Sequence, residues 1–294
     1  MCRLLGIVAS ELTEFGLGLT EAPRCLAKLS REHRDGWGIA VHRADHAHDE
    51  RDAEHRWLLH KGTAPAVDDR RFHELAARSR GHLLVAHIRQ KTVGPTRLEN
   101  THPFVSDGWV FAHNGTIQHQ DGLRAGCSGR RLREIAGDTD SELFFAYVLT
   151  RMDERGLVHL ESSARDPRGA MREELTHLLH ELTAELRAQR IGAFNFLLSD
   201  GRTTFAHRFG RSLFVLERAP GDPVREVRPI DGAATITTKW TARRNAILIA
   251  SERTTDEPWQ EVDDGTLLRI DRSPTPQIVT TSAAGQHAGQ RVAS

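Results

Sequence analysis

The sequence predicts an α+β protein built from antiparallel sheets. Short apolar segments follow one another with only turns between them, and two long stretches with helical periodicity stand apart from these runs. Strands and helices do not alternate, as they would in the βαβ units of a parallel sheet. With 294 residues, of which 38% are hydrophobic and 27% charged, the chain can bury one large core or two small ones.

The predicted strands are short apolar runs bounded by turn residues. The first covers residues 3–9, directly after Met1 and Cys2. Residues 37–42 and 57–60 flank a polar stretch and are expected to form a hairpin. Asp200-Gly201 indicates a tight turn between two later strands. The other strands are predicted over residues 83–88, 109–113, 194–198, 203–207, 211–217, 246–250 and 266–270.

Two helices are predicted. Residues 139–152 begin with polar side chains and continue with apolar residues at helical spacing. Asp166 and Pro167 suit the N-cap and first position of a second helix, which carries a stripe of leucines and ends near Gly192. From Ser273 onward little can be buried. We therefore expect one domain over residues 2–272 and a disordered tail over residues 273–294.

The composition argues against several classes of protein. The 40 basic and 40 acidic side chains balance, so no overall field favours nucleic acid or an anionic membrane. No apolar segment approaches the roughly 20 residues of a transmembrane helix, and the first residues do not resemble a signal peptide. Cys2, Cys25 and Cys127 are too irregularly spaced for a disulfide framework or a metal motif. A cytoplasmic location is expected.

Five histidines near the predicted hairpin raise the question of a metal site. Their spacing matches no tight ligand pattern, and Asp, Glu and Arg are mixed among them. A solvated hairpin tip explains them as well, so no metal and no cofactor are predicted. They are His42, His46, His48, His55 and His60.

Cys2 is the first candidate for a catalytic residue. An initiator Met before a small residue is normally removed, and here its removal would leave a thiol and a free α-amino group on one residue. One residue would then supply both nucleophile and base. The alternative, an ordinary residue at the start of a strand, has to be weighed against the rest of the sequence.

Further polar groups stand where predicted strands end or a helix begins. Asn114 and Gly115 follow a strand, and their N–H groups can converge on a developing oxyanion or simply form a turn. Arg89 also follows a strand, and its guanidinium can hold a carboxylate through two hydrogen bonds or form a surface ion pair. Asp140 opens a helix, where it can cap the helix or hold a ligand ammonium.

Six motifs occur in order along the chain: Met1-Cys2-Arg3-Leu4-Leu5-Gly6, Asp35-Gly36-Trp37-Gly38-Ile39-Ala40, Ala86-His87-Ile88-Arg89, Asn100-Thr101-His102-Pro103-Phe104, His113-Asn114-Gly115 and Thr139-Asp140-Ser141-Glu142. Together they resemble the class II glutamine amidotransferases of the N-terminal nucleophile hydrolase superfamily, and more narrowly the stand-alone members without a fused synthase domain. The resemblance covers most of residues 2–270. It implies a four-layer αββα sandwich of two antiparallel sheets.

The resemblance also implies roles for the candidate residues. Cys2 would be the nucleophile and its own α-amino group the general base. With a reference pKa of about 7.7–8.0, roughly a tenth to a sixth of such amines are unprotonated at neutral pH. Asn114 and Gly115 would form the oxyanion hole. Arg89 would hold the α-carboxylate of glutamine, and Asp140 its α-ammonium group.

Two positions depart from the synthase members of the family. Gln90 follows Arg89 where those members have an aromatic residue, and Val93 follows Thr92 where they have His. These neighbours line the glutamine pocket in the family, so the substrate stays open. Thr92 remains a candidate substrate contact. Trp37 either shapes the pocket floor or packs in the core.

Three functions follow from these observations. The first is release of ammonia from glutamine through a Cys2 thioester, either alone or for a partner protein that accepts the ammonia. The second is hydrolysis of another γ-glutamyl amide, as in stand-alone relatives in ergothioneine biosynthesis. The third is a binding module that keeps the fold without the activity. Neither nucleic acid nor membrane is an expected partner.

Overall fold

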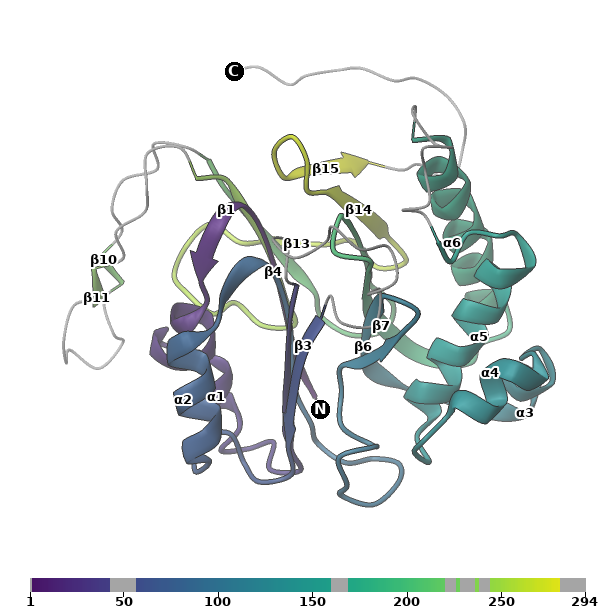
Figure 1. Ribbon diagram of the computed structural model, residues 1–294, viewed down its shortest axis with the longest axis horizontal. Coiled ribbons are helices and arrows are strands. Elements are labelled where there is room, and N and C mark those ends of the chain that lie inside the picture. The colour runs from purple at the N-terminus through teal and green to yellow at the C-terminus, as the bar shows by residue number, and fades with distance from the viewer. Residues whose placement is uncertain are drawn as a thin grey trace.

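The computed structural model describes residues 2–42, 57–159, 169–219, 226–227, 236–237 and 244–280. Two antiparallel sheets lie face to face, and helices cover the outer face of each (Figure 1). The predicted four-layer αββα sandwich is confirmed.

The first sheet contains the start of the chain at its centre. Its seven strands have the order β13-β9-β12-β1-β4-β2-β3. β1 pairs antiparallel with both β4 and β12, and β2 and β3 form the predicted hairpin. The strands are β1 (Arg3–Glu14), β2 (Trp37–His42), β3 (Trp57–Gly62), β4 (Arg80–Ile88), β9 (Phe214–Arg218), β12 (Ala246–Ala250) and β13 (Gln260–Glu261).

The second sheet has six strands in the order β15-β14-β8-β7-β6-β5. The turn at Asp200-Gly201 joins β7 to β8, as predicted. The strands are β5 (Phe104–Ser106), β6 (Trp109–Ile117), β7 (Gly192–Ser199), β8 (Thr203–His207), β14 (Leu267–Asp271) and β15 (Gln277–Thr280). A separate ribbon pairs β10 (Glu226–Val227) with β11 (Ile236–Thr237).

The helices bury their apolar faces on the two sheets. The π-helical turn η1 (Leu17–Glu21), α1 (Leu26–Leu29) and α2 (Arg70–Arg78) cover the first sheet. The second is covered by α3 (Gln120–Ala125), α4 (Gly129–Glu134), α5 (Asp140–Glu154) and α6 (Ala170–Ala188) (Figure 1). No helix in these described ranges is long and apolar enough to cross a membrane.

Two expectations need correction: where helix α6 begins, and whether the C-terminal segment is disordered. Helix α6 begins at Ala170 with Gly169 as its N-cap; Asp166 and Pro167 lie outside the described residues. The segment after Ser273 is not wholly disordered, because β15 pairs with β14 along one edge of the second sheet. Ile278 of β15 packs against the layer between the sheets. Pairing with β14 and the packing of Ile278 together order a segment whose composition indicates disorder.

Candidate active site

Strand alternation places Cys2 and Arg89 in the space between the two sheets. Leu4 of β1 and Val85 of β4 belong to the apolar layer between the sheets. Successive side chains of a strand point to opposite faces, so Cys2, two residues before Leu4, faces this layer as well. The ladder continues past β4, where the Arg89 N–H donates to Gly36 O (2.8 Å). Arg89 therefore faces the same space as Cys2.

The backbone of Gln90 holds the sulfur of Cys2. The Gln90 N–H donates to Sγ, and the thiol donates to Gln90 O, both at 3.3 Å. Burial raises the pKa of the Cys2 thiol, while the Gln90 N–H and the positive charge of Arg89 oppose that rise and the charge of Asp140 adds to it. Cys2, Arg89 and Asp140 thus share one electrostatic environment. Met1 lies outside the described residues.

The side chain of Gln90 turns toward His33. Its Oε1 lies 3.0 Å from His33 Nδ1. Gln90, which departs from the synthase pattern, therefore contacts the sulfur of Cys2 through its backbone and the buried imidazole of His33 through its side chain.

Arg89 organises the loop that follows it. The buried guanidinium (3% exposed) donates to Val93 O (2.9 Å), Gly94 O (3.3 Å) and Pro95 O (3.0 Å). Arginine has five N–H donors, and these bonds use one on Nη1 and both on Nη2, so Nε–H and one N–H of Nη1 remain for a ligand. Burial lowers the pKa of Arg89, and the nearby Cys2, Asp35 and Asp140 oppose that shift.

Asp140 joins helix α5 to the end of β6. Thr139 is the N-cap of α5 and accepts from the Glu142 N–H at 3.2 Å. The buried carboxylate of Asp140 accepts from the N–H of Ile117 (2.6 Å) and of Ser141 (3.0 Å). These bonds bring a carboxylate within electrostatic range of Cys2, although the two residues are far apart in sequence.

Asn114 and Gly115 lie on β6, opposite Asn195 and Phe194 of β7. Asn114 comes two residues after Ala112, which packs in the layer between the sheets, so it faces the first sheet. The residue is 5% exposed, and its side-chain amide makes no hydrogen bond within the described part of the chain. It can therefore donate to a ligand. A Cβ at position 115 would collide with the Ala193 carbonyl oxygen, so only glycine fits.

Trp37 and Thr92 do not join this group. Trp37 belongs to the opposite face of the first sheet, where it is fully buried and packs edge-on against Phe72 at 5.1 Å. Its Nε1 donates to Asp69 (2.8 Å). The pocket-floor interpretation of Trp37 is therefore wrong, and the core-packing alternative holds. Thr92 is exposed in the loop after Arg89, and no contact joins it to the other candidates in the described ranges.

Three buried histidines form a layer beside the site that the sequence did not single out. The rings of His87 and His102 have centroids 4.3 Å apart, and His113 lies 6.5 Å from His102. Burial lowers the pKa of His87 to about 3, so this imidazole is neutral at physiological pH. His113 Nδ1 contacts Ser141 Oγ at 2.8 Å, next to Asp140. Each histidine stands in one of the sequence motifs, which is the signal that could have identified the layer.

No group of three or more His, Cys, Asp or Glu side chains suited to a metal occurs in the described ranges. His42 and His60 lie on the paired strands β2 and β3. His46, His48 and His55 lie outside those ranges.

Comparison with known proteins agrees with this geometry. The sequence profile described as glutamine amidotransferases class-II matches residues 1–293. A Haemophilus influenzae protein named as a glutamine amidotransferase is 29% identical over 272 residues, covering 90% of this chain and 82% of its own length. The gamma-glutamyl-hercynylcysteine sulfoxide hydrolase of Mycobacterium tuberculosis is 25% identical over 303 residues, covering 99% of this chain and its own full length.

A solved structure shows the same fold. The crystal structure of a Pseudomonas aeruginosa protein titled as a glutamine amidotransferase superimposes with a TM-score of 0.57 at 24% identity, covering 95% of this chain and all of its own. The match of the family profile over nearly the whole length carries the assignment: the chain belongs to the class II glutamine amidotransferases.

Proposed function

We propose that the protein hydrolyses the side-chain amide of glutamine, or a related γ-glutamyl amide, through a thioester on Cys2. One observation carries this proposal. A thiol, a guanidinium and a carboxylate from three separate parts of the chain lie within electrostatic range of one another, and the side-chain amide of Asn114 faces the same space between the sheets from β6.

The chemistry needs Met1 to be removed, so that the α-amino group of Cys2 can take the thiol proton. The thiolate attacks the amide carbon and forms a C–S bond. The resulting oxyanion accepts hydrogen bonds from the side chain of Asn114 and the N–H of Gly115. Collapse breaks the C–N bond, and the α-ammonium group returns its proton to the leaving amine. Water, deprotonated by the α-amino group of Cys2, then attacks the thioester carbon; the C–S bond breaks, glutamate is released and the α-ammonium group returns the proton to the thiolate.

Substrate orientation would come from two opposite charges. Arg89 retains its Nε–H and one N–H of Nη1 for the α-carboxylate, and Asp140 supplies a carboxylate for the α-ammonium group. Thr92 is a further candidate contact through the loop that Arg89 holds. Recognition of both charges leaves the amide end of the substrate facing the sulfur.

A γ-glutamyl amide with a larger amine is the second candidate substrate. A relative that matches 99% of this chain is named for hydrolysis of such an amide. The Gln90 side chain, drawn toward His33, also takes the place of the aromatic residue in the synthases. If glutamine is the substrate, the released ammonia can pass to a partner protein. A reducing compartment such as the cytoplasm would keep the thiol reactive.

The test compares three cysteine variants in an assay of ammonia or amine release from glutamine and from a series of γ-glutamyl amides. Cys2→Ala should abolish release. Cys25→Ala and Cys127→Ala are matched controls: Cys25 is buried, and burial raises the pKa of Cys127 to about 11. Equal loss in all three variants, or no activity in the wild-type protein toward any γ-glutamyl amide, would contradict the proposal and favour a non-catalytic binding module.

A further inference from the structure

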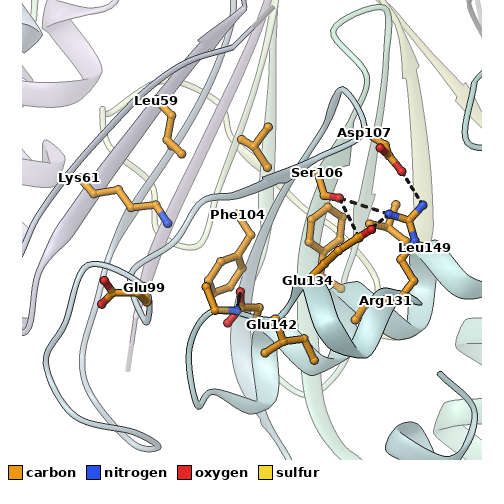
Figure 2. Close-up of a pocket in the computed structure, with 15 residues that line it drawn as sticks. Leu59, Lys61, Glu99, Phe104, Ser106, Asp107, Arg131, Glu134, Glu142 and Leu149 are labelled. Atoms are coloured by element: carbon orange, nitrogen blue, oxygen red, sulfur yellow. Dashed lines mark hydrogen bonds and ion pairs between the residues drawn. The ribbon is translucent and has the colours of Figure 1, made fainter. Parts of the chain in front are cut away.

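A cavity of about 510 Å³ opens between the edge strands of the two sheets, β3 and β5, and helices α4 and α5. Figure 2 shows the side chain of Lys61 on one side of it, pointing toward Phe104. Its apolar walls are Leu59, Phe104, Val105, Phe145 and Leu149. The volume lies in the range of small-molecule sites.

Most of the charged side chains around this cavity already have polar partners. Arg131 is fully buried and pairs with Asp153 (2.7 Å), Glu134 (2.8 Å) and Asp107 (2.7 Å). Glu142 accepts from the N–H groups of two loop residues, 136 and 137. These groups hold α4, α5 and the β5–β6 turn together and leave no cation for a ligand.

Lys61 is the exception. Its Nζ lies 5.1 Å from the centroid of the Phe104 ring and makes no hydrogen bond or ion pair within the part of the chain that is described. Burial lowers the pKa of Lys61 to about 8, although Glu142 and Glu99 act to raise it. A desolvated ammonium without a partner is costly, and a carboxylate from a ligand would remove that cost.

The cavity is separate from the Cys2 site. Lys61, Gly38, His87 and Leu4 are paired in one row across four strands. Lys61 thus stands two strands from His87, about 10 Å at the usual strand spacing. The carbonyl of His102 lies over Gly38 and fills the gap. The histidine layer therefore divides the cavity from the catalytic group, none of whose candidate residues lines the cavity.

We propose that this cavity is a second binding site, for a small organic molecule with one carboxylate group on an apolar body. The carboxylate pairs with Lys61, and the body packs on Phe104 and the apolar walls. One free ammonium matches one negative charge. The acidic side chains around the cavity, Glu99, Asp107, Glu134 and Glu142, disfavour phosphate esters and polyanions.

The test is calorimetric titration of the full-length protein with acetate, isovalerate, 3-phenylpropionate, the neutral 3-phenylpropan-1-ol and phenyl phosphate. The Cys2→Ala variant is titrated in parallel, because binding here does not depend on hydrolysis. Affinity should rise with the apolar body, and the alcohol should bind roughly ten- to a hundredfold more weakly than the matching acid.

Two variants probe the site itself. Lys61→Met keeps the apolar stem of the side chain and should weaken the binding of 3-phenylpropionate roughly ten- to a hundredfold as well. Ala146→Phe fills the cavity from α5 and should abolish binding with Lys61 still present. Lys28→Met, an exposed lysine on the far face of the first sheet, is the control and should bind like wild type.

Three results would overturn the proposal: no saturable binding of any of the acids, equal affinity for acid and alcohol, or tighter binding of phenyl phosphate. Unfolding temperatures of the variants separate loss of the site from loss of the fold. If Ala146→Phe is unstable, Lys61→Met alone decides the question.

Discussion

Gly115 offers the most direct structural test of the β6 end of the site. An added Cβ would overlap the Ala193 carbonyl oxygen and lie 2.6 Å from His113 Nε2. Overpacking a core costs about 1–3 kcal/mol, and a backbone carbonyl cannot rotate away as a side chain can. We expect Gly115→Ala to cost about 3 kcal/mol, which lowers Tm by roughly 6–12 °C in a domain of this size.

Gly122 is the matched control. It lies within helix α3, and a Cβ there would meet no atom within 4 Å. Alanine favours a helix over glycine by about 0.5–1 kcal/mol, so Gly122→Ala should raise Tm by about 2 °C. Calorimetry and amide hydrolysis are measured on both variants. Activity should fall only in Gly115→Ala, whose N–H is displaced. A Tm for Gly115→Ala equal to that of wild type would refute the close approach of β6 and β7.

Four further predictions concern the site and its surroundings. Asn114→Ala should lower kcat roughly 10²–10³-fold with little change in KM, and a loss confined to KM would remove it from the oxyanion hole. Arg89→Lys should raise KM and lower Tm together, because one ammonium cannot reach three loop carbonyls; an unchanged KM argues against carboxylate binding. Trp37→Phe should lower Tm by losing its bond to the second helix and leave KM unaltered, whereas a raised KM would return Trp37 to the pocket. The last prediction concerns pH. Burial lowers the pKa of His87 to about 3 and that of His207 to about 4, so the unfolded chain binds more protons. Their contribution to stability is complete above pH 6.5 and is lost as the pH falls toward those values. Each of these two histidines should lower the free energy of unfolding by about 2 kcal/mol between pH 7 and pH 5, as measured by denaturant titration. A His207→Asn variant with an undiminished pH dependence would contradict this assignment.

Local pattern was sufficient to predict an antiparallel α+β architecture, and the resemblance to the family added the four-layer sandwich. Short apolar runs and turn residues located most strands, because each strand buries at least one face and carries its own periodicity. The same information did not extend to β15, where order depends on the packing of Ile278 on a sheet formed elsewhere in the chain. The start of α6 was also misplaced, because a favourable N-cap pair does not decide where packing begins.

The candidate site, too, was predictable from the sequence only in part. Motif order predicted one site for Cys2, Arg89 and Asp140, and in the structure Arg89 and Asp140 lie within electrostatic range of Cys2. The sequence could not show that the guanidinium of Arg89 already donates hydrogen bonds to loop carbonyls. Nor could it show on which face of β2 Trp37 lies. Lys61 was missed because the sequence around it predicts only the second strand of a hairpin. Alternation with Leu59 is the signal that places it inward.

The central claim is that the sulfur of Cys2 carries the acyl group at the start of a chain from which Met1 has been removed. Active protein is mixed with the best γ-glutamyl substrate, quenched in acid, digested and analysed by mass spectrometry. The account predicts a γ-glutamyl thioester on a peptide that begins with Cys2, and its absence from Cys2→Ala. An adduct on Cys25 or Cys127, or full activity in protein that retains Met1, would contradict it.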